Sequence, residues 1–377
     1  MDIGIPKEFN RHEHRVGLTP RAVSHLTENG HSVIVERSAG DAAFFEDGRY
    51  EAAGAQIVYH PEEVYKRADV VCKVGSILTE NLDLLKKGSI ICAFQHLAVY
   101  PKEKIERLME LKATVIGYEI VRDVEGRIPV KTPFSEMAGQ MAVHLAAHYL
   151  QTEEGGRGIL MGSVPGVPPP TVLVLGGGTV GRTAAGVAHQ NGAHVVVLDI
   201  DMEQLREINN MFRGQVVTAL STRDNLRYFT QIADVMIGAV LVPGERPEKI
   251  VTEQMVMKMR SGSVIVDLAI DQGGCIETSR PTSIDDPTYN VHGVVHYCVP
   301  NLTSNMARTA SRALADAALP YVSTIADLGL KTAVCEDPGI GAGTYLYQGK
   351  MVHEVTGEAF DIPASPIEDC LEGKARS

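Results

Sequence analysis

Short apolar runs recur along the first 120 positions of the chain, and polar or amphipathic stretches separate them. The runs are predicted to be strands at Ile3–Pro6, His31–Glu36, Asp69–Val74, Ser89–Phe94 and Thr114–Tyr118. Helices fit between them: Thr19-Pro20 is typical of a helix start, and Lys102–Leu111 is predicted to be helical. Strands that alternate with helices favour a parallel sheet covered on both faces.

The same alternation resumes after a boundary in the middle of the chain. A long helix is predicted from Ser135 to about Gln151, and a stretch rich in Gly and Pro follows it. Another helix is expected over about Thr303–Ala317, with Pro320 interrupting the pattern. Between these helices lie six predicted strands: Thr171–Leu175, His194–Asp199, Gln215–Leu220, Asp234–Val240, Ser263–Ile270 and Gly293–Val299.

Composition supports an α/β fold with more than one domain. At about 150 residues per domain, 377 residues suggest two or three domains. Aromatic residues make up only 5% of the chain and Trp is absent, so small and β-branched side chains must fill the cores. This balance suits α/β architecture better than a β-sandwich.

Charge and cysteine content limit the partners that we expect. A net charge of -12 repels phosphate backbones, so no nucleic acid partner is expected. The six cysteines form no C-x-x-C pattern and are interpreted as reduced thiols. The N-terminus does not resemble a signal peptide, and no run reaches the ~18 apolar residues of a membrane span. We therefore expect a cytoplasmic protein without a membrane partner.

A glycine motif follows the predicted strand Thr171–Leu175. Its G-x-G-x-x-G glycines are Gly176, Gly178 and Gly181. In a dinucleotide-binding turn the first glycine allows the tight turn, the second lets the backbone approach a pyrophosphate, and the third lets helix and strand pack closely. The N-terminus of the helix that follows would face the phosphates.

An acid at the end of the next strand strengthens this interpretation. Asp199 ends the strand that begins at His194, 18 residues after Gly181. A carboxylate there accepts hydrogen bonds from the adenosine ribose and repels a 2′-phosphate. The sequence therefore predicts NAD rather than NADP as cofactor. The alternative is a structural βαβ turn that binds no ligand.

Several further motifs give the chain a family resemblance that extends to about Leu330. It resembles the alanine dehydrogenase and transhydrogenase alpha-subunit family, and His96 and Asp271–Gly274 favour the alanine dehydrogenase branch. The motifs that carry the resemblance are Gly4–Glu8, Arg15–Pro20, Phe94–Ala98, Gly162–Gly166, Ile237–Gly244 and Val266–Gly274.

The resemblance implies a fold, a reaction and an assembly. We expect two Rossmann-like, doubly wound parallel-sheet domains with a cleft between them. Residues 1–134 with 303–377 would form the substrate domain, and residues 135–302 the NAD-binding domain. The implied reaction is reversible, NAD-dependent oxidative deamination of L-alanine or a related L-amino acid to the 2-oxo acid and ammonia. The implied assembly is a homohexamer.

Three residues are the main candidates for substrate binding and proton transfer. Arg15 is the best clamp for the substrate carboxylate, because a guanidinium binds carboxylate bidentately. His96 follows a predicted strand and can act as acid or base near neutral pH. Asp271 is expected to close the strand Ser263–Ile270 and to move protons as a carbinolamine forms and collapses. The alternatives are a surface arginine, a structural histidine and an Asx turn before a Gly pair.

The resemblance also implies further cofactor contacts, most of them through backbone groups or packing. Of these, Asp199 is the position that the motif alone also predicts. The implied residues are Ser135, Thr179, Val180, Asp199, Ser221, Val240, Leu241, Leu268, Arg280 and Asn301.

The sequence departs from the family pattern at two places. Alanine dehydrogenases typically carry Lys-Val-Lys-Glu-Pro, in which the second lysine contacts substrate, but here Gly75 stands at that position and Lys73 matches the first lysine. Strand alternation would place Lys73 and Gly75 on the same face, so Lys73 is a candidate substitute if the strand shifts by two residues. Thr324 and Leu328 occupy positions where some relatives present metal ligands, so no metal is expected there.

The glycine leaves the substrate open. Alanine remains one possibility, with Lys73 or another group in the role of the lost lysine. A related amino acid or imine oxidoreductase with a larger or differently charged substrate is a second. An NAD-binding, transhydrogenase-like module without turnover is a third, although Arg15, His96 and Asp271 argue against it.

Overall fold

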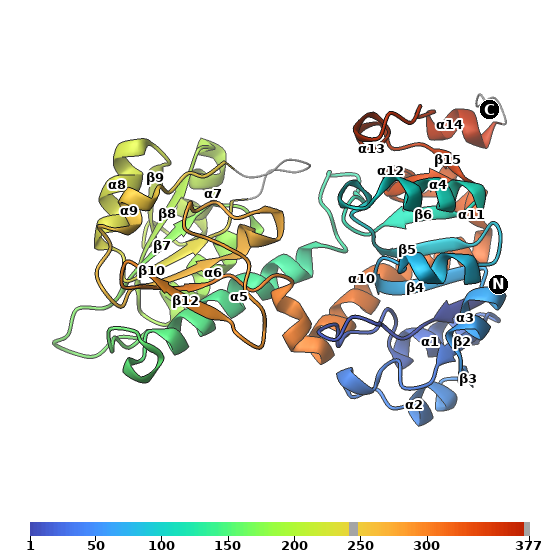
Figure 1. Cartoon of the computed structure of the whole chain (residues 1–377), viewed down its shortest axis with the longest axis horizontal. Coiled ribbons are helices and arrows are strands. Elements are labelled where there is room, and N and C mark those ends of the chain that lie inside the picture. The colour runs from blue at the N-terminus through green and yellow to red at the C-terminus, as the bar shows by residue number, and fades with distance from the viewer. Residues whose placement is uncertain (241–247, 373–377) are drawn as a thin grey trace. The chain divides into compact units, whose positions relative to one another are not determined.

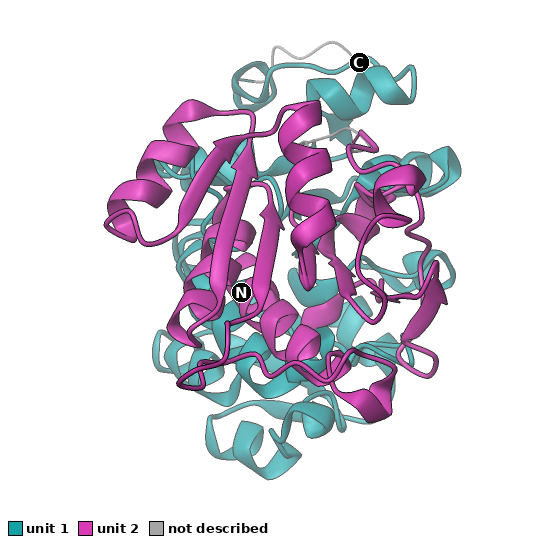
Figure 2. Ribbon diagram, turned by 90° about the vertical axis from the view of Figure 1, so that its left-hand side faces the viewer, with its two compact units in different colours: residues 1–134, 304–377 teal, residues 135–303 magenta. Residues whose placement is uncertain are grey.

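The computed structural model describes residues 1–240 and 248–372. It divides into two compact units (Figure 2). Each unit has its own sheet. Unit 1 contains both ends of the chain, Met1–Phe134 and Ser304–Ser377, and unit 2 is the continuous segment Ser135–Thr303. The chain leaves unit 1 within helix α5 (Thr132–Tyr149) and returns within the short 3₁₀ helix η6 (Leu302–Met306).

Unit 1 has an eight-stranded sheet in the order β15-β14-β6-β5-β4-β1-β2-β3 (Figure 1). The first six strands along the chain run parallel. They are β1 (Asp2–Ile5), β2 (Ser32–Glu36), β3 (Gln56–Val58), β4 (Val70–Gly75), β5 (Ile90–Phe94) and β6 (Thr114–Gly117). The helices that connect them are α1 (Pro20–Glu28), α2 (Asp47–Ala52), α3 (Pro61–Arg67) and α4 (Lys102–Glu110).

The C-terminal part of the chain completes unit 1. Strands β14 (Thr344–Tyr347) and β15 (Lys350–Met351) add an antiparallel hairpin beside β6. Its Leu346 side chain is fully buried in the same core cluster as Val115 of β6. The remaining helices are α10 (Ala307–Leu328), α11 (Leu330–Glu336), α12 (Pro338–Ala342), α13 (Glu354–Ala359) and α14 (Ile367–Leu371).

Unit 2 has a seven-stranded sheet in the order β12-β13-β11-β10-β7-β8-β9. All strands are parallel except β12, which pairs antiparallel with β13. The strands are β7 (Thr171–Leu175), β8 (His194–Asp199), β9 (Val217–Leu220), β10 (Val235–Gly238), β11 (Val264–Asp267), β12 (Thr288–Val291) and β13 (Val294–Tyr297). The helices after α5 are α6 (Thr179–Gln190), α7 (Met202–Met211), α8 (Arg223–Ile232) and α9 (Glu253–Val256).

Both parallel sheets have the same strand order. Numbered along the chain within each unit, the parallel strands lie in the order 3-2-1-4-5-6, the order of a doubly wound dinucleotide-binding fold. The expected fold class of two Rossmann-like units is therefore confirmed. The order reverses between β1 and β4 in unit 1 and between β7 and β10 in unit 2. Ligands of such sheets bind beyond the carboxyl ends of the strands at these two points.

The core of unit 2 explains the scarcity of aromatic residues. Alternate residues of β7 point to opposite faces, so that Val172 and Val174 enter one core cluster and Leu173 and Leu175 the other. Helix α6 covers the first face with alanines, including Ala184. Small side chains allow the helix to approach the sheet closely.

Two local expectations were wrong. Strand β11 ends at Asp267, because the Asp267 carboxylate accepts the Ala269 N–H at 3.1 Å and starts a 3₁₀ helix, η5 (Leu268–Gln272). Asp271 therefore lies on η5 rather than directly at the strand end. Pro320 lies inside the unbroken helix α10, whose buried Val322 and Ile325 stabilise it despite one missing hydrogen bond. In the described part of the chain, none of the helices combines the length and apolarity that a membrane crossing needs.

Candidate active site

The glycine turn lies at the carboxyl end of β7, at the reversal point of unit 2. Gly176 has φ +98°, which an L side chain rarely adopts, and a Cβ there would lie 2.7 Å from the Ala239 carbonyl oxygen after β10. Its N–H donates to the Leu198 carbonyl at 2.8 Å. The turn is therefore clamped between the ends of β8 and β10.

The other two glycines of the motif have opposite environments. Gly178 is exposed at the N-cap of α6, and a Cβ there would have no heavy atom within 4 Å. Gly181 is buried, and a Cβ there would collide with the Gly176 carbonyl oxygen. Gly178 thus leaves its backbone open to a ligand, while Gly181 permits the close packing of helix and strand.

Asp199 joins this turn to the end of β8. Its carboxylate accepts the Gly177 N–H at 2.5 Å and the Asp201 N–H at 2.8 Å. A carboxylate offers about four lone-pair positions, so these two bonds are compatible with further bonds to ribose hydroxyls. The side chain is half-buried, and a ligand on the glycine turn would lie beside it.

Most of the other expected cofactor residues lie at the carboxyl ends of the unit 2 strands. Thr179 and Val180 begin α6, and the Ser221 N–H donates to the Asp199 carbonyl at 2.8 Å. Val240 follows β10 closely, and Leu268 begins η5 after β11. Leu241 lies outside the described residues.

Three expected cofactor residues lie farther along the chain from these strand ends. Asn301, with φ +51°, donates its N–H to Asp271 Oδ1 at 2.9 Å, which joins two predicted site residues. Arg280 is exposed and packs its guanidinium over the Tyr289 ring at 4.2 Å. Ser135 lies half-buried in α5.

In unit 1, Arg15 is not a surface arginine. Only 6% of it is exposed, and its guanidinium bonds the Glu13 carboxylate through Nε at 2.6 Å and Nη2 at 2.5 Å. The guanidinium also packs over the Phe134 ring, 5.5 Å from the centroid. It follows β1, one of the two strands at the reversal point.

His96 follows β5 and contacts the same aromatic wall. Its exposed ring stacks against Phe94 with centroids 6.3 Å apart, and Phe94 meets Phe134 edge-on at 5.2 Å. Arg15 and His96 therefore lie against the two members of one aromatic pair. Unit 1 brings these two predicted residues together.

Sequence analysis missed Glu119, which holds the backbone of His96. His96 has φ +44° and ψ +45°, a conformation that few non-glycine residues adopt. The buried Glu119 carboxylate accepts the His96 N–H at 2.5 Å and the Gln95 N–H at 3.0 Å. Tyr345 OH also donates to it at 2.8 Å, and burial together with this carboxylate raises the pKa of Tyr345. An acid directly after a buried strand was the available signal.

Lys73 and Gly75 lie at the end of β4, on the other side of the reversal point from β1. The buried Lys73 Nζ pairs with Glu8 Oε2 at 2.9 Å, and Glu8 Oε1 accepts the Val74 N–H at 2.8 Å. The register with β5 shifts between Cys72 and Gly75, so the regular alternation that placed Lys73 and Gly75 on one face does not hold. A Cβ at Gly75 would have only Glu8 Oε2 within 4 Å, at 3.9 Å.

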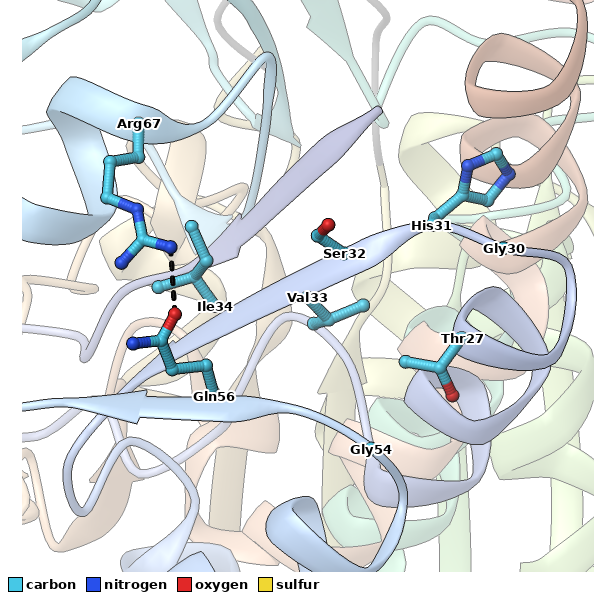
Figure 3. A pocket seen from close by; sticks show the side chains of 9 residues that line it. All are labelled: Thr27, Gly30, His31, Ser32, Val33, Ile34, Gly54, Gln56 and Arg67. Atoms are coloured by element: carbon cyan, nitrogen blue, oxygen red, sulfur yellow. Dashed lines mark hydrogen bonds between the residues drawn. The ribbon is translucent and has the colours of Figure 1, made fainter.

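A separate hollow lies at the amino end of β2, away from these strand ends (Figure 3). Arg67 donates to Gln56 across it at 2.8 Å. It contains none of the residues that sequence analysis selected. Its lining residues are Thr27, Gly30, His31, Ser32, Val33, Ile34, Gly54, Gln56 and Arg67.

Fold and site together define a class of enzyme. One doubly wound unit carries a dinucleotide-type glycine turn with an acid, and the other carries a buried arginine and a histidine at its strand ends. This combination is that of a nicotinamide-nucleotide-dependent oxidoreductase of the α/β class.

Comparison with known proteins identifies the family. Residues 4–138 match the family described as Alanine dehydrogenase/PNT, N-terminal domain, and residues 142–354 match Alanine dehydrogenase/PNT, C-terminal domain. The chain belongs to this family.

The similar relatives span the whole chain. The alanine dehydrogenase of Methanococcus maripaludis is 42% identical over 372 residues, covering 98% of this chain and 100% of the relative. That of Halomonas elongata is 42% identical over 363 residues, covering 96% and 97%. A solved L-alanine dehydrogenase superposes with a TM-score of 0.91 at 42% identity, covering 96% of this chain and 99% of that one. A transhydrogenase from Sinorhizobium meliloti, at 24% identity and TM-score 0.80, shares the fold.

The two glycines allow stability and cofactor binding to be separated. Gly181→Ala should lower the unfolding free energy by about 1–3 kcal/mol or more, because its methyl group overlaps the Gly176 carbonyl. Gly178→Ala should leave stability nearly unchanged but weaken NAD binding, because the methyl group projects into the space that a pyrophosphate would fill. Urea unfolding followed by circular dichroism and NAD calorimetry measure both effects. Full NAD affinity in Gly178→Ala would contradict the assignment of the turn.

Glu119→Gln tests whether this carboxylate positions His96. The amide keeps the shape but loses charge-assisted acceptance of two backbone N–H groups, worth about 1.5–3 kcal/mol each. We expect turnover to fall about tenfold or more while NAD affinity stays constant, since NAD is assigned to unit 2. Glu125→Gln, on an exposed side chain of the same unit, is the matched control. Unchanged turnover in Glu119→Gln would argue against the positioning role.

Proposed function

We propose that this protein catalyses the reversible, NAD-dependent oxidative deamination of L-alanine to pyruvate and ammonia. The observation that carries the proposal is identity of 40–42% with alanine dehydrogenases over 96–99% of the chain. A larger-substrate oxidoreductase and a module without turnover gain no support from the relatives.

The described residues of unit 2 fit NAD. The exposed Gly178 backbone and the N-terminus of α6 suit a pyrophosphate, and Asp199 suits the ribose hydroxyls while repelling a 2′-phosphate. When bound there, NAD would supply the hydride acceptor for oxidation at the substrate Cα. The other expected contacts, from Ser135 to Asn301, remain assignments by resemblance.

Arg15 is assigned to the substrate carboxylate. A guanidinium binds a carboxylate bidentately, and burial strengthens this interaction by excluding water. Glu13 and Phe134 hold the guanidinium in place before substrate arrives. Lys73 is assigned a supporting role in substrate binding, with Glu8 fixing its ammonium.

His96 and Asp271 are assigned to proton transfer. Deamination needs a base for the proton of the water that attacks the imine carbon, and an acid for the departing amine. His96 is exposed at a strand end and held by its backbone, so its ring can exchange protons without loss of position. Asp271, held by Asn301, is the second candidate for these protons.

We further propose a homohexamer in the cytoplasm. The hexamer rests on the family resemblance. The location is supported by the six cysteines, which are all free thiols, as expected for a reducing compartment.

Substrate and cofactor are tested together with the purified chain. We expect reduction of NAD with L-alanine at a kcat/KM of about 10⁴ M⁻¹s⁻¹ or above, the range of ordinary enzymes. NADP should bind much more weakly than NAD in calorimetry because of Asp199. A panel of other L-amino acids is the control. If a different amino acid is strongly preferred or alanine is inert, the substrate assignment fails.

The proton-transfer assignments predict a specific pattern in two variants. His96→Ala and Asp271→Asn should each lower turnover by roughly 10²-fold or more, because positioned acids and bases contribute on that scale. NAD affinity should survive His96→Ala, since that residue belongs to unit 1. His12→Ala provides a control histidine. Near-full activity of both variants would rule out the assignment.

The hexamer is tested by light scattering at micromolar protein. The chain mass is 40.7 kDa, so a hexamer would have six times that mass. A monomer mass under these conditions would refute the proposed assembly.

A further inference from the structure

A second buried lysine lies near the carboxyl end of β4, and no step above uses it. Lys104 is the third residue of α4, and only 2% of it is exposed. Its Nζ donates to Ser76 Oγ at 2.7 Å and lies 3.5 Å from the centroid of the Tyr100 ring. The side chain therefore reaches from the helix to the residue that follows Gly75.

This ammonium differs from the other buried cations near the site. Arg15 is paired with Glu13, and Lys73 is paired with Glu8. Within residues 1–240 and 248–372, Lys104 has no carboxylate within ion-pair distance, and its contacts are a hydroxyl and an aromatic face. The two buried carboxylates of this region, Glu8 and Glu36, interact with Lys73, and Lys73 is the charge that acts on Lys104.

Burial of such a charge is costly unless an anion compensates it. Burial and repulsion by Lys73 lower the pKa of Lys104 to about 8, so the ammonium is destabilised as the structure stands. A bound carboxylate would favour the charged form again. An anion beside the Lys104 ammonium would therefore be stabilised.

Gly75, the chain neighbour of Ser76, has open space where a side chain would begin. A Cβ at this position would have only Glu8 Oε2 within 4 Å, at 3.9 Å, and both Gly75 and Ser76 are half-exposed. Access from the strand end toward Ser76, the partner of Lys104, is not blocked by a residue 75 side chain. The residue that accepts the Lys104 hydrogen bond, Ser76, is therefore the direct neighbour of the glycine that lacks a side chain.

We propose that Lys104 is a substrate-binding residue whose ammonium, held by Ser76, binds the oxygen atoms of the 2-oxo acid. The inference rests on the proposed function, because it assigns a cation to the substrate of that reaction. A charge-assisted donor supplied from α4 would take the place of one on the strand at position 75. A purely structural lysine, which only ties α4 to the end of β4, is the competing explanation.

The first experiment compares Lys104→Met with Lys102→Met, a control on the same helix. We expect the KM for pyruvate to rise about tenfold or more in Lys104→Met, the loss typical of a hydrogen bond to a charged group. Binding of oxamate to the enzyme with NADH, measured by calorimetry, should weaken in parallel. NADH affinity and the Lys102→Met variant should match the wild type. A pyruvate KM within twofold of wild type, or an equal loss of NADH affinity, would overturn the inference.

The second experiment returns a lysine to the strand. Gly75→Lys should restore pyruvate binding in the Lys104→Met background, but should bring no gain where Lys104 is present. If Gly75→Lys lowers the pyruvate KM tenfold in the wild-type background, no other residue supplies the missing ammonium there. That result would overturn the inference even if Lys104→Met does not fold. If the wild type fails to turn over alanine, the proposed function is wrong, and the substrate-binding role of Lys104 is wrong as well. If it succeeds and Lys104→Met is unaffected, only the inference fails.

Discussion

Reversal of strand order is the constraint on which both halves of this protein depend. Where β1 lies beside β4, and β7 beside β10, the connections leave the sheet in opposite directions. The loops at the carboxyl ends therefore separate instead of covering one another, and their backbone groups lack a strand partner. Arg15 and Lys73 lie at this reversal point in unit 1, and the glycine turn lies at the reversal point in unit 2. The candidate site residues therefore lie where the sheet itself cannot satisfy the backbone.

Side-chain carboxylates accept hydrogen bonds from many of these backbone N–H groups. Glu8 accepts an N–H from Val74, Glu119 accepts two at His96 and Gln95, and Asp199 accepts two around the glycine turn. Asp267 does the same after β11, at Ala269 and Cys275. Burial raises the pKa of Asp267, so the same bonds that order the loop must offset the cost of its charge. Loop order and site electrostatics are thus set by the same side chains.

The sequence predicted the regular parts well for a physical reason. Strands β7 and β8 were predicted with their observed bounds, because fully buried parallel strands form continuous apolar runs between turn residues. The strands β3 and β15 were missed because three and two residues are too few to show a period, and β12 and β14 were missed because Thr, Tyr and Asn interrupt their apolar runs. The C-terminal hairpin also pairs with β6 across more than 200 residues, which no local pattern can indicate.

The residues of the candidate site also differ in whether a local sequence pattern could predict them. The glycines and Asp199 follow from local spacing, whereas Arg15, His96 and Asp271 needed the family resemblance. Glu119 and Lys104 escaped both, because their importance lies in contacts with residues 23 to 28 positions away.

Position 75 shows why similarity of the whole chain does not determine each contact within it. At 42% identity the fold superposes with a TM-score of 0.91, so the fold is shared while more than half of the aligned side chains differ. A lysine at the end of a strand and a lysine in the first turn of a helix can place an ammonium in the same region, because parallel strands end, and the helices that follow them begin, at the same edge of the sheet. The restriction is electrostatic: a second ammonium beside Lys73 already lowers the pKa of Lys104. A third buried ammonium beside Lys73 and Lys104 would add further repulsion, so a glycine at position 75 is compatible with Lys104 in a way that a lysine would not be.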